Sequence, residues 1–313
     1  LKTGYLGCVR AVRRKLREIQ PDLVHGQGTE RDCAHSAVLS GYPNLVTIHG
    51  VMGSLHQTLG GRFFSYYRWA KALEAHAIRK TDGVVCISSF VEQFVAPRAR
   101  RTWSIPNAIR SPFFKEPSSA GRRAGPARLL NVGTIYPLKQ QVELLRELRE
   151  LREHVDFEVT FVGALRQGTP YGALFTQLLA EANALHGGFR HMEKVDETEL
   201  LHLFDDSDAL LQFSKEESFG LVFAEAQARG LALFVSDVGA IREISRGNSE
   251  CHISNSLDLT AARDWIQSGR HLRPKNFKLA KVLSEKFSPR RVAASHLDAY
   301  RSLLEDHPAG QTA

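Results

Sequence analysis

The sequence is poor in cysteine and has no long apolar run. Its four cysteines lie far apart among 313 residues and form no CxxC pair, which argues against a disulfide framework or a structural zinc site. No stretch of eighteen apolar residues is present, and the start of the chain carries no signal-peptide pattern. We therefore expect a cytoplasmic protein in a reducing compartment, with no segment that spans a membrane.

Several catalytic and binding motifs are also missing. The sequence has no P-loop, no GxSxG nucleophile motif, no HExxH zinc motif, and no zinc-finger, RNP or helix-turn-helix pattern. We therefore expect neither those enzyme classes nor a nucleic-acid partner. An Asp-Ser-Asp triplet at residues 206–208 precedes an apolar run, whereas a metal-binding DxD should follow one, so no metal is expected.

Positive charge is concentrated in the first part of the chain. Residues 1–123 carry 19 Lys and Arg against 8 Asp and Glu, a net +11, which leaves −4 for the remainder of the total of +7. Residues 9–19 predict a helix with one apolar stripe and one arginine stripe. Such a helix more often packs on its own sheet, but it can also lie on an anionic membrane. Peripheral contact with the inner face of the membrane is thus the alternative to a purely cytoplasmic location.

Short β-branched runs alternate with helical patterns along the chain. Strands are predicted at residues 22–25, 45–49, 83–88, 103–106, 129–132, 157–163, 190–195, 210–214 and 231–237. Helices are predicted between them, among others at 62–80, 141–152, 172–185 and 197–204. Residues 111–126 are rich in Pro, Ser, Gly and Arg and predict a linker. The alternation predicts an α/β fold with two facing Rossmann-like domains.

These boundaries define the expected domains. The first, incomplete domain is placed at residues 1–120, the second at 121–286, and a C-terminal helix and tail, packing back on the first domain, at 287–313.

The segment KEESFGLVFAEAQARG, residues 215–230, places Glu217 and Glu225 eight positions apart. It predicts a turn and a helix after a strand, with Ser218 as the N-cap and Gly230 just beyond the helix end. Glu225 would project from an apolar face, where an unpaired carboxylate is costly, so it should have a partner. Taken alone, such a pattern more often belongs to an amphipathic helix whose acids pair with nearby basic residues.

Other polar residues follow predicted strands. Gly133 and Thr134 follow the run LLNV, Lys139 comes shortly afterwards at a helix start, and His49 follows LVTI. Ligands of doubly wound sheets bind beyond the carboxyl ends of the strands. A helix N-terminus, backbone N–H groups exposed by glycine, and a lysine together indicate a site for a phosphate or diphosphate.

Taken in order, these stretches resemble glycosyltransferase family 4, the group 1 glycosyltransferases of GT-B fold. The matching stretches are PDLVHGQG, LVTIHG, IRKTDGVVCIS, SIPNAI, LLNVGTIYPLKQ, FVGAL, VDETELLHLFDDSDALLQFS and ESFGLVFAEAQARG. The resemblance implies an enzyme that transfers a sugar from a nucleotide-sugar to a glycan or lipid-linked acceptor. It also implies retention at the anomeric carbon, and no cofactor besides the donor substrate.

The resemblance further implies roles for individual residues. His49 and Glu217 would face the donor sugar as the catalytic pair. The residues implied to bind the donor and its nucleotide are Gly133, Thr134, Lys139, Ser218, Phe219, Gly220, Leu221 and Glu225. Within this set, Lys139 would neutralise the diphosphate, and Glu225 would bind the ribose hydroxyls.

Two departures from the family pattern affect the expected activity. Many members carry Arg where this chain has Thr134, which removes one cation from the diphosphate site. The family's first domain also opens with strands and a Gly-rich loop that this sequence does not contain, so we expect that domain to be truncated at its N-terminus. The alternative function is therefore a non-catalytic or weakly active chain that only binds nucleotide-sugar, and a nucleotide-sugar epimerase of similar fold is a third candidate.

Overall fold

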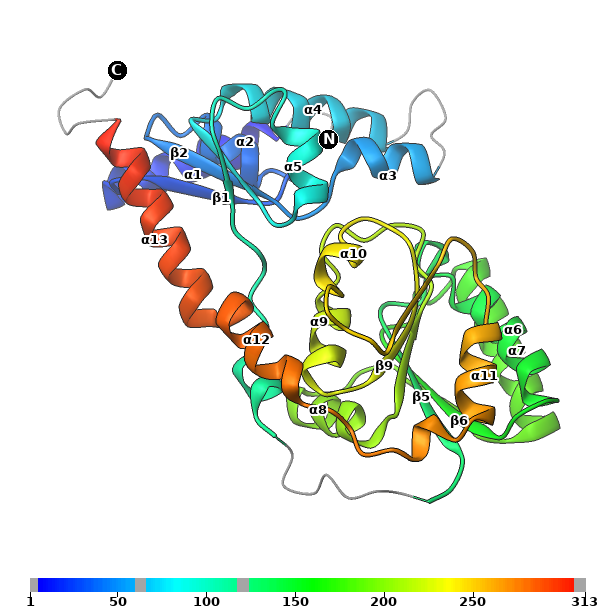
Figure 1. Cartoon of the computed structure of the whole chain (residues 1–313). Helices are drawn as coiled ribbons and strands as arrows, with labels where there is room; N and C mark the ends of the chain where they lie inside the picture. Colours follow the sequence, from blue (N-terminus) through cyan, green and yellow to red (C-terminus); the bar gives the residue numbers. More distant parts are fainter. Residues whose placement is uncertain (1–4, 60–65, 117–123, 307–313) are drawn as a thin grey trace. The chain divides into compact units, whose positions relative to one another are not determined.

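The computed structural model describes residues 5–59, 66–116 and 124–306 (Figure 1). Contacts divide the chain into two units. The first unit comprises Leu1–Ala108, Glu217–Phe219 and Pro289–Ala313, and the second comprises Ile109–Glu216 and Gly220–Ser288. Apart from residues 217–219, the chain therefore leaves the first unit after Ala108 and rejoins it at Pro289.

The first unit is built on a four-stranded parallel sheet in the order β1-β2-β3-β4. The strands are β1 (Val24–Gln27), β2 (Asn44–Ile48), β3 (Gly83–Cys86) and β4 (Thr102–Ser104). The helices are α1 (Leu6–Ile19), α2 (Cys33–Val38), α3 (Met52–Leu59), α4 (Tyr66–Lys80), α5 (Ser89–Val95) and α13 (Pro289–Glu305). Every residue of β2 and β3 is buried, as expected for the inner strands of a parallel sheet that helices cover.

Helix α13 comes from the far end of the chain and belongs to the core of the first unit. One apolar cluster consists of Leu45, Val85, Ile105, Val292, Ala299 and Leu303. On the same helix, the Tyr300 hydroxyl lies 2.7 Å from His25 Nδ1, across 275 positions of sequence. The first unit is therefore held together by pairs that lie far apart in the chain.

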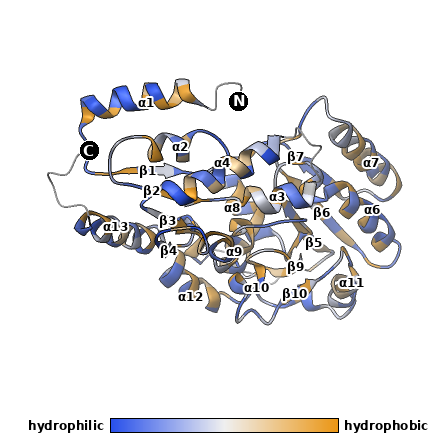
Figure 2. Ribbon diagram, turned by 90° about the horizontal axis from the view of Figure 1, so that it is seen from above, coloured by the Kyte–Doolittle hydropathy of each residue, from blue (hydrophilic) through white to orange (hydrophobic). Residues whose placement is uncertain are grey.

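Helix α1 packs only lightly on the first unit. It contacts α2, and Val9 is the one residue of this helix that is buried. Ile19 is 60% exposed and Leu6 is 50% exposed. Figure 2 shows hydrophobic and hydrophilic residues alternating around the helix. None of the helices in the described part of the chain has the length and hydropathy needed to cross a bilayer.

The second unit contains a six-stranded parallel sheet in the order β10-β9-β8-β5-β6-β7. The strands are β5 (Ala127–Val132), β6 (Phe157–Val162), β7 (Phe189–Met192), β8 (Ala209–Gln212), β9 (Ala232–Ser236) and β10 (Cys251–Ser254). The helices are α6 (Gln141–Arg152), α7 (Pro170–His186), α8 (Glu197–Asp206), α9 (Leu221–Ala228), α10 (Ile241–Ile244), α11 (Thr260–Gln267) and α12 (Lys278–Phe287). Three short 3-10 helices are η1 (Ser111–Phe114), η2 (Pro137–Lys139) and η3 (Arg270–Leu272). The strand order reverses between β5 and β8, which is where ligands of such sheets bind.

The predicted α/β class with two Rossmann-like domains is confirmed, because each unit has a parallel sheet with helices between its strands. All nine predicted strands are present within a few residues of their expected positions. The tenth, β10, was not predicted, since the alternation of Cys-His-Ile-Ser extends over only four residues and contains no apolar run. For the predicted helix at 62–80, α4 covers 66–80, and residues 62–65 lie outside the described residues.

The predicted linker at 111–126 is wrong at its beginning. Residues 111–114 form η1, which contacts α9 and α12. Phe113 in this helix is fully buried. The buried Arg229 guanidinium also donates to the carbonyl oxygen of Lys115. Residues 117–123 of this predicted linker lie outside the described residues. The predicted boundary between residues 120 and 121 remains a prediction, whereas contacts group residues 109–116 with the second unit.

Candidate functional site

The first group of predicted site residues lies at the carboxyl end of β5 in the second unit. Gly133 and Thr134 follow the strand, and Gly163 follows β6 beside them. A Cβ atom on Gly163 would overlap the carbonyl oxygen of Gly133, so only glycine allows the two loops this close approach. Cδ and Cε of Lys139 lie 3.9 Å from the position that a Cβ atom on Gly133 would occupy. The structure therefore brings the lysine side chain alongside Gly133.

Two hydrogen bonds attach the η2 turn, which carries Lys139, to the loop that follows β8. The backbone N–H of Lys215 donates to the carbonyl oxygen of Leu138 at 2.8 Å. Gln140 Nε2 donates to the carbonyl oxygen of Phe213 at 2.7 Å. The predicted diphosphate turn is therefore fixed to the neighbouring strand end at the point where the sheet order reverses.

Buried amide side chains lie beneath this turn and were not predicted from the sequence. Asn131 Nδ2 donates to Gln212 Oε1 at 3.0 Å, and both side chains are buried. Their signal in the sequence is a polar residue inside each apolar strand, which is unusual because buried polar groups need partners. This hydrogen bond joins the carboxyl-terminal residues of β5 and β8.

The helix that follows the second loop begins later than predicted. Helix α9 starts at Leu221, and its N-cap is Gly220 in the left-handed region with φ 84°, without a side-chain cap. The prediction of Ser218 as N-cap is therefore wrong. A Cβ atom on Gly220 would overlap the ring of Phe223, so glycine is required here for space as well as for its φ. Gly230, with φ 69°, follows the C-cap as predicted.

Glu225 lies inside α9 and is only 6% exposed, as its apolar neighbours suggested. Its partner in the structure is Arg110, whose Nη2 and Nε lie 3.0 Å and 3.3 Å from Oε1. Arg110 Nη1 also lies 3.3 Å from Oε2 of Glu197 at the start of α8. Burial raises the pKa of Glu225, and the neighbouring guanidinium opposes that rise. The sequence predicted the need for a partner but not Arg110, which lies 115 positions away.

His49 lies in the first unit, directly after β2. Its Nε2 lies 2.9 Å from Gln27 Oε1 at the end of β1, a residue that was not predicted. Burial lowers the pKa of His49, and His296 adds to this, while Glu30 opposes it. The imidazole is therefore neutral at neutral pH and can both donate and accept a hydrogen bond.

The predicted site residues fall in both units. Contacts group His49, Glu217, Ser218 and Phe219 with the first unit, and Gly133, Thr134, Lys139, Gly220, Leu221 and Glu225 with the second. Their implied roles with donor and nucleotide remain predictions.

The Asp-Ser-Asp triplet at 206–208 has structural contacts. Asp208 accepts a hydrogen bond from the backbone N–H of Arg128 at 2.8 Å. The hydroxyl of Ser207 donates to the backbone carbonyl oxygen of Leu203. Within the described ranges, no three His, Cys, Asp or Glu side chains are grouped so as to hold a metal ion.

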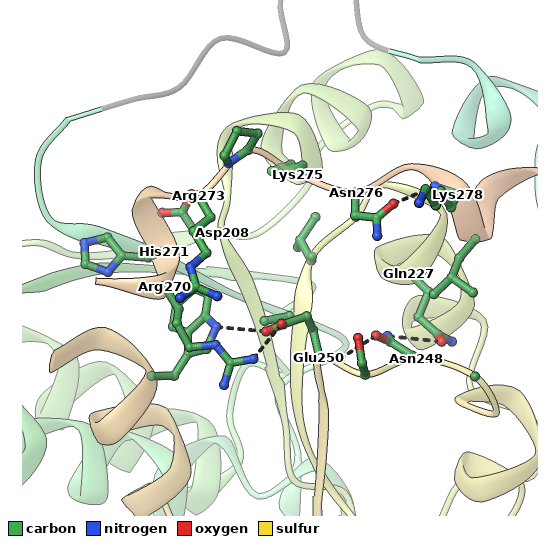
Figure 3. A pocket seen from close by; sticks show the side chains of 18 residues that line it. Asp208, Gln227, Asn248, Glu250, Arg270, His271, Arg273, Lys275, Asn276 and Lys278 are labelled. Atoms are coloured by element: carbon green, nitrogen blue, oxygen red, sulfur yellow. Dashed lines mark hydrogen bonds and ion pairs between the residues drawn. The ribbon is translucent and has the colours of Figure 1, made fainter. Parts of the chain in front are cut away.

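A cavity of 310 Å³ in the second unit is lined by residues at the amino ends of β8 and β9, so it lies at the other edge of the sheet from the predicted diphosphate turn. Figure 3 shows the side chains that line it. Two of its cationic side chains have partners within the unit. Arg270 pairs with Glu250 at 2.5 Å, and Lys275 donates to the carbonyl oxygens of Phe204 and Asp205 at 2.8 Å each. Burial lowers the pKa of Lys275 to about 8. These contacts attach residues 270–275 to neighbouring elements.

Two family models match the chain, one in each part. The model described as Glycosyltransferase Family 4 matches residues 2–111, and the model described as Glycosyl transferases group 1 matches residues 113–263. The matches meet where the chain passes from the first unit to the second.

Among curated proteins, the chain is 30% identical to a glycogen synthase of Mycobacterium tuberculosis over 240 residues, which is 72% of this chain and 55% of that protein. It is 29% identical to a D-inositol 3-phosphate glycosyltransferase of Paenarthrobacter aurescens over 207 residues, which is 63% of this chain and 49% of that protein. The chain thus spans about half the length of these relatives.

Solved structures share the fold. A sucrose-phosphate synthase from Thermosynechococcus elongatus superposes with a TM-score of 0.77 at 19% identity, over 95% of this chain and 77% of that one. Anabaena Alr3699/HepE in complex with UDP-glucose superposes with a TM-score of 0.74 at 17% identity, over 95% and 82%.

Proposed function

The chain belongs to the group 1 glycosyltransferases of family 4, and on that premise we propose that it transfers a sugar from a nucleotide-sugar to an acceptor hydroxyl, with retention at the anomeric carbon. The observation that supports this most is the turn carrying Lys139. This lysine lies alongside Gly133 at the point where the sheet order reverses, and its turn is hydrogen-bonded to the loop after β8. A cation and backbone donors at that place suit a diphosphate.

The proposed reaction breaks the bond between the anomeric carbon and the diphosphate oxygen while the acceptor oxygen attacks from the same face. Negative charge grows on the departing diphosphate, where Lys139 and nearby backbone N–H groups stabilise it. Each well-placed donor is worth about 3–4 kcal/mol in such reactions. The departing phosphate oxygen takes the proton of the acceptor hydroxyl, so no side chain has to act as nucleophile.

The other predicted residues would act on the sugar and the ribose. Glu217 would hold donor-sugar hydroxyls, and the neutral His49 imidazole would contact the sugar ring. Glu225 would accept hydrogen bonds from the ribose hydroxyls. Thr134, where many family members carry Arg, leaves Lys139 as the cation we assign to the leaving group, so the reaction should depend strongly on this lysine.

The proposed acceptor is a glycan or a lipid-linked sugar, and the proposed location is the cytoplasm, with peripheral contact at an anionic membrane. The support for membrane contact is α1, an arginine-rich helix along which hydrophobic and hydrophilic residues alternate (Figure 2) and whose apolar residue Ile19 is exposed. No metal is proposed for the reaction. The binding-only alternative is not favoured, because relatives that match much of the chain carry the names of a synthase and a transferase.

Calorimetry with UDP and GDP, followed by turnover assays with a panel of UDP- and GDP-sugars that includes UDP-glucose, tests this proposal. We expect Lys139→Ala to weaken binding of the preferred nucleotide roughly 10- to 100-fold, because a charge-assisted contact is lost. Lys281→Ala, an exposed lysine on α12 of the same unit, is the matched control and should bind normally. If neither UDP nor GDP binds at millimolar concentration, the proposal is refuted.

The roles of His49 and Glu217 need turnover data. His49→Ala and Glu217→Ala should each lower kcat while leaving UDP affinity almost unchanged, since both are assigned to the sugar. The opposite pattern would reassign them to the nucleotide.

A further inference from the structure

The contact between Arg110 and Glu225 is asymmetric. Both nitrogens that Arg110 directs at Glu225 end on the same carboxylate oxygen, Oε1. Within the described chain, these are the hydrogen bonds that the Glu225 side chain accepts, which leaves Oε2 for a ligand. Arginine and carboxylate pairs often engage both oxygens in a fork-shaped contact, which is not the case here.

Arg110 is held in place from two further sides. Its guanidinium lies over the ring of Phe113, 4.8 Å from the ring centre, and Phe113 is fully buried in η1. Its third nitrogen, Nη1, pairs with Glu197 at the start of α8. The guanidinium is therefore fixed by η1, α8 and α9 together, and all of these lie in the second unit.

We propose that Arg110 is a positioning residue of the nucleotide site: it anchors Oε1 of Glu225 so that Oε2 is oriented to accept a ribose hydroxyl. This inference rests on the proposed function, since it presumes that Glu225 receives the ribose. Nothing in the local sequence marks Arg110 for this role, because the residue reaches Glu225 only through the fold.

Arg110 has a second effect, on the charge of Glu225. Two charged groups act on this carboxylate within the described chain: Arg110, which lowers its pKa, and Glu197, which raises it in addition to the larger effect of burial. An ionised carboxylate accepts hydroxyl hydrogen bonds more strongly than a protonated one. Removing Arg110 should therefore raise the pKa of Glu225 further and weaken ribose binding at pH values where the wild type is still ionised.

The test is calorimetry of the full chain with UDP between pH 5 and pH 8, comparing wild type with Arg110→Gln and Arg110→Lys. The terminal phosphate of UDP also titrates near pH 6, so the informative quantity is the difference between variant and wild type. For Arg110→Gln we expect roughly tenfold weaker binding at pH 7. We also expect the loss of binding in acid to begin at a higher pH than in the wild type.

Arg110→Lys separates charge from orientation. Lysine keeps the positive charge but cannot direct two nitrogens at one oxygen. Its UDP affinity should decrease over the same acidic pH range as that of the wild type. At pH 7 its UDP affinity should be several-fold lower than that of the wild type. Inorganic diphosphate, which has no ribose, should bind all three proteins equally, and this control also shows whether the variants are folded.

The outcomes separate the two proposals. If the wild type binds neither UDP nor GDP, the proposed function fails. If the wild type binds UDP and Arg110→Gln matches it in both affinity and pH profile, the positioning role alone is refuted. Tighter binding by Arg110→Gln would also refute it, since the guanidinium would then occupy the place that the ribose needs. If Arg110→Gln weakens UDP binding and diphosphate binding equally, Arg110 has only a structural role and the positioning role is refuted.

Discussion

The two units differ in how they are held together. The second unit contains an aromatic and aliphatic cluster that runs through β5, β6, β7, β8 and β9, with ring contacts such as that of Phe161 with Phe175 at 5.3 Å. In the first unit, an apolar cluster takes three of its six buried residues, Val292, Ala299 and Leu303, from α13 at the far end of the chain. This unit also contains the buried carboxylate of Glu74 and the part-buried imidazole of His25. The apolar core of the second unit is therefore built from one nearly continuous stretch of chain, whereas that of the first is complete only when α13 has joined it.

The largest effect on stability is expected from truncating an aromatic core residue of the second unit. Phe161→Ala should reduce the free energy of unfolding of that unit by about 3–5 kcal/mol, because the fully buried ring leaves a cavity. Hydrogen exchange followed peptide by peptide should show faster exchange in residues 127–267 and little change in the first unit. Leu185→Ala, at an exposed site on α7, is the control. Equal acceleration in both units would show that they unfold as one and would break the comparison.

A smaller effect is expected at the buried carboxylate of the first unit. Glu74 accepts hydrogen bonds from the hydroxyl of Thr29 at 2.7 Å and from the backbone N–H of Met52 at 3.1 Å. Glu74→Ala leaves both donors buried without a partner and should cost about 2–3 kcal/mol, measured by denaturant unfolding. Glu74→Gln can still accept these bonds and should cost less. If Gln were as damaging as Ala, the negative charge rather than the hydrogen bonds would be what matters.

The smallest expected effect is the loss of stability of the first unit at acidic pH, caused by His25. Burial, together with His296 and His49, lowers the pKa of His25 to about 4, below the ordinary value of 6.5. The unfolded chain therefore binds a proton between these two pH values that the folded chain does not. Stability of the first unit should be unaffected above pH 6.5, fall by about 1–2 kcal/mol as the pH drops towards 4, and then level off, allowing for the partial exposure of the ring.

The effect of His25 is isolated by comparing the wild type with His25→Asn in denaturant unfolding at several pH values. The comparison is needed because burial raises the pKa of Glu74, and that carboxyl group acts in the opposite sense. His25→Asn should flatten the dependence between pH 6.5 and 4, while His154→Asn, an exposed histidine of the second unit, should not change it. An unchanged slope in His25→Asn would mean that other groups govern the acid response of the first unit.

The sequence was most informative where structure depends on local pattern. Strands β5 to β9 of the second unit, the burial of Glu225 and the position of Gly230 all follow from periodicity and backbone preference. The N-cap at Ser218 was wrong because a left-handed Gly220 delays the helix, and a serine two residues earlier gives no sign of this. β10 was missed because its alternation extends over only four residues, which is the shortest run that indicates a strand.

Contacts between distant segments were beyond such patterns. Arg110 and Glu225 are 115 positions apart, and His25 and Tyr300 are 275 positions apart. Neither pair has a spacing that marks it, since each partner is brought in by the fold. The same holds for the bond from Gln140 to Phe213, which fixes the turn carrying Lys139. The sequence could therefore propose the residues of the candidate site, but it could not predict the contacts that hold them in place.

The double passage of the chain between the units has a consequence for folding during synthesis. Apart from residues 217–219, the second unit is one continuous stretch, and all of it has been synthesised before α13 emerges from the ribosome. The first unit begins to emerge earlier but still lacks Val292, Tyr300 and Leu303, its partners from α13. Domains usually complete in the order in which they are translated. Here the order should be reversed, with the second unit native while the first still exposes the apolar surface that α13 will cover, so chaperones that shield nascent chains should bind mainly the first unit.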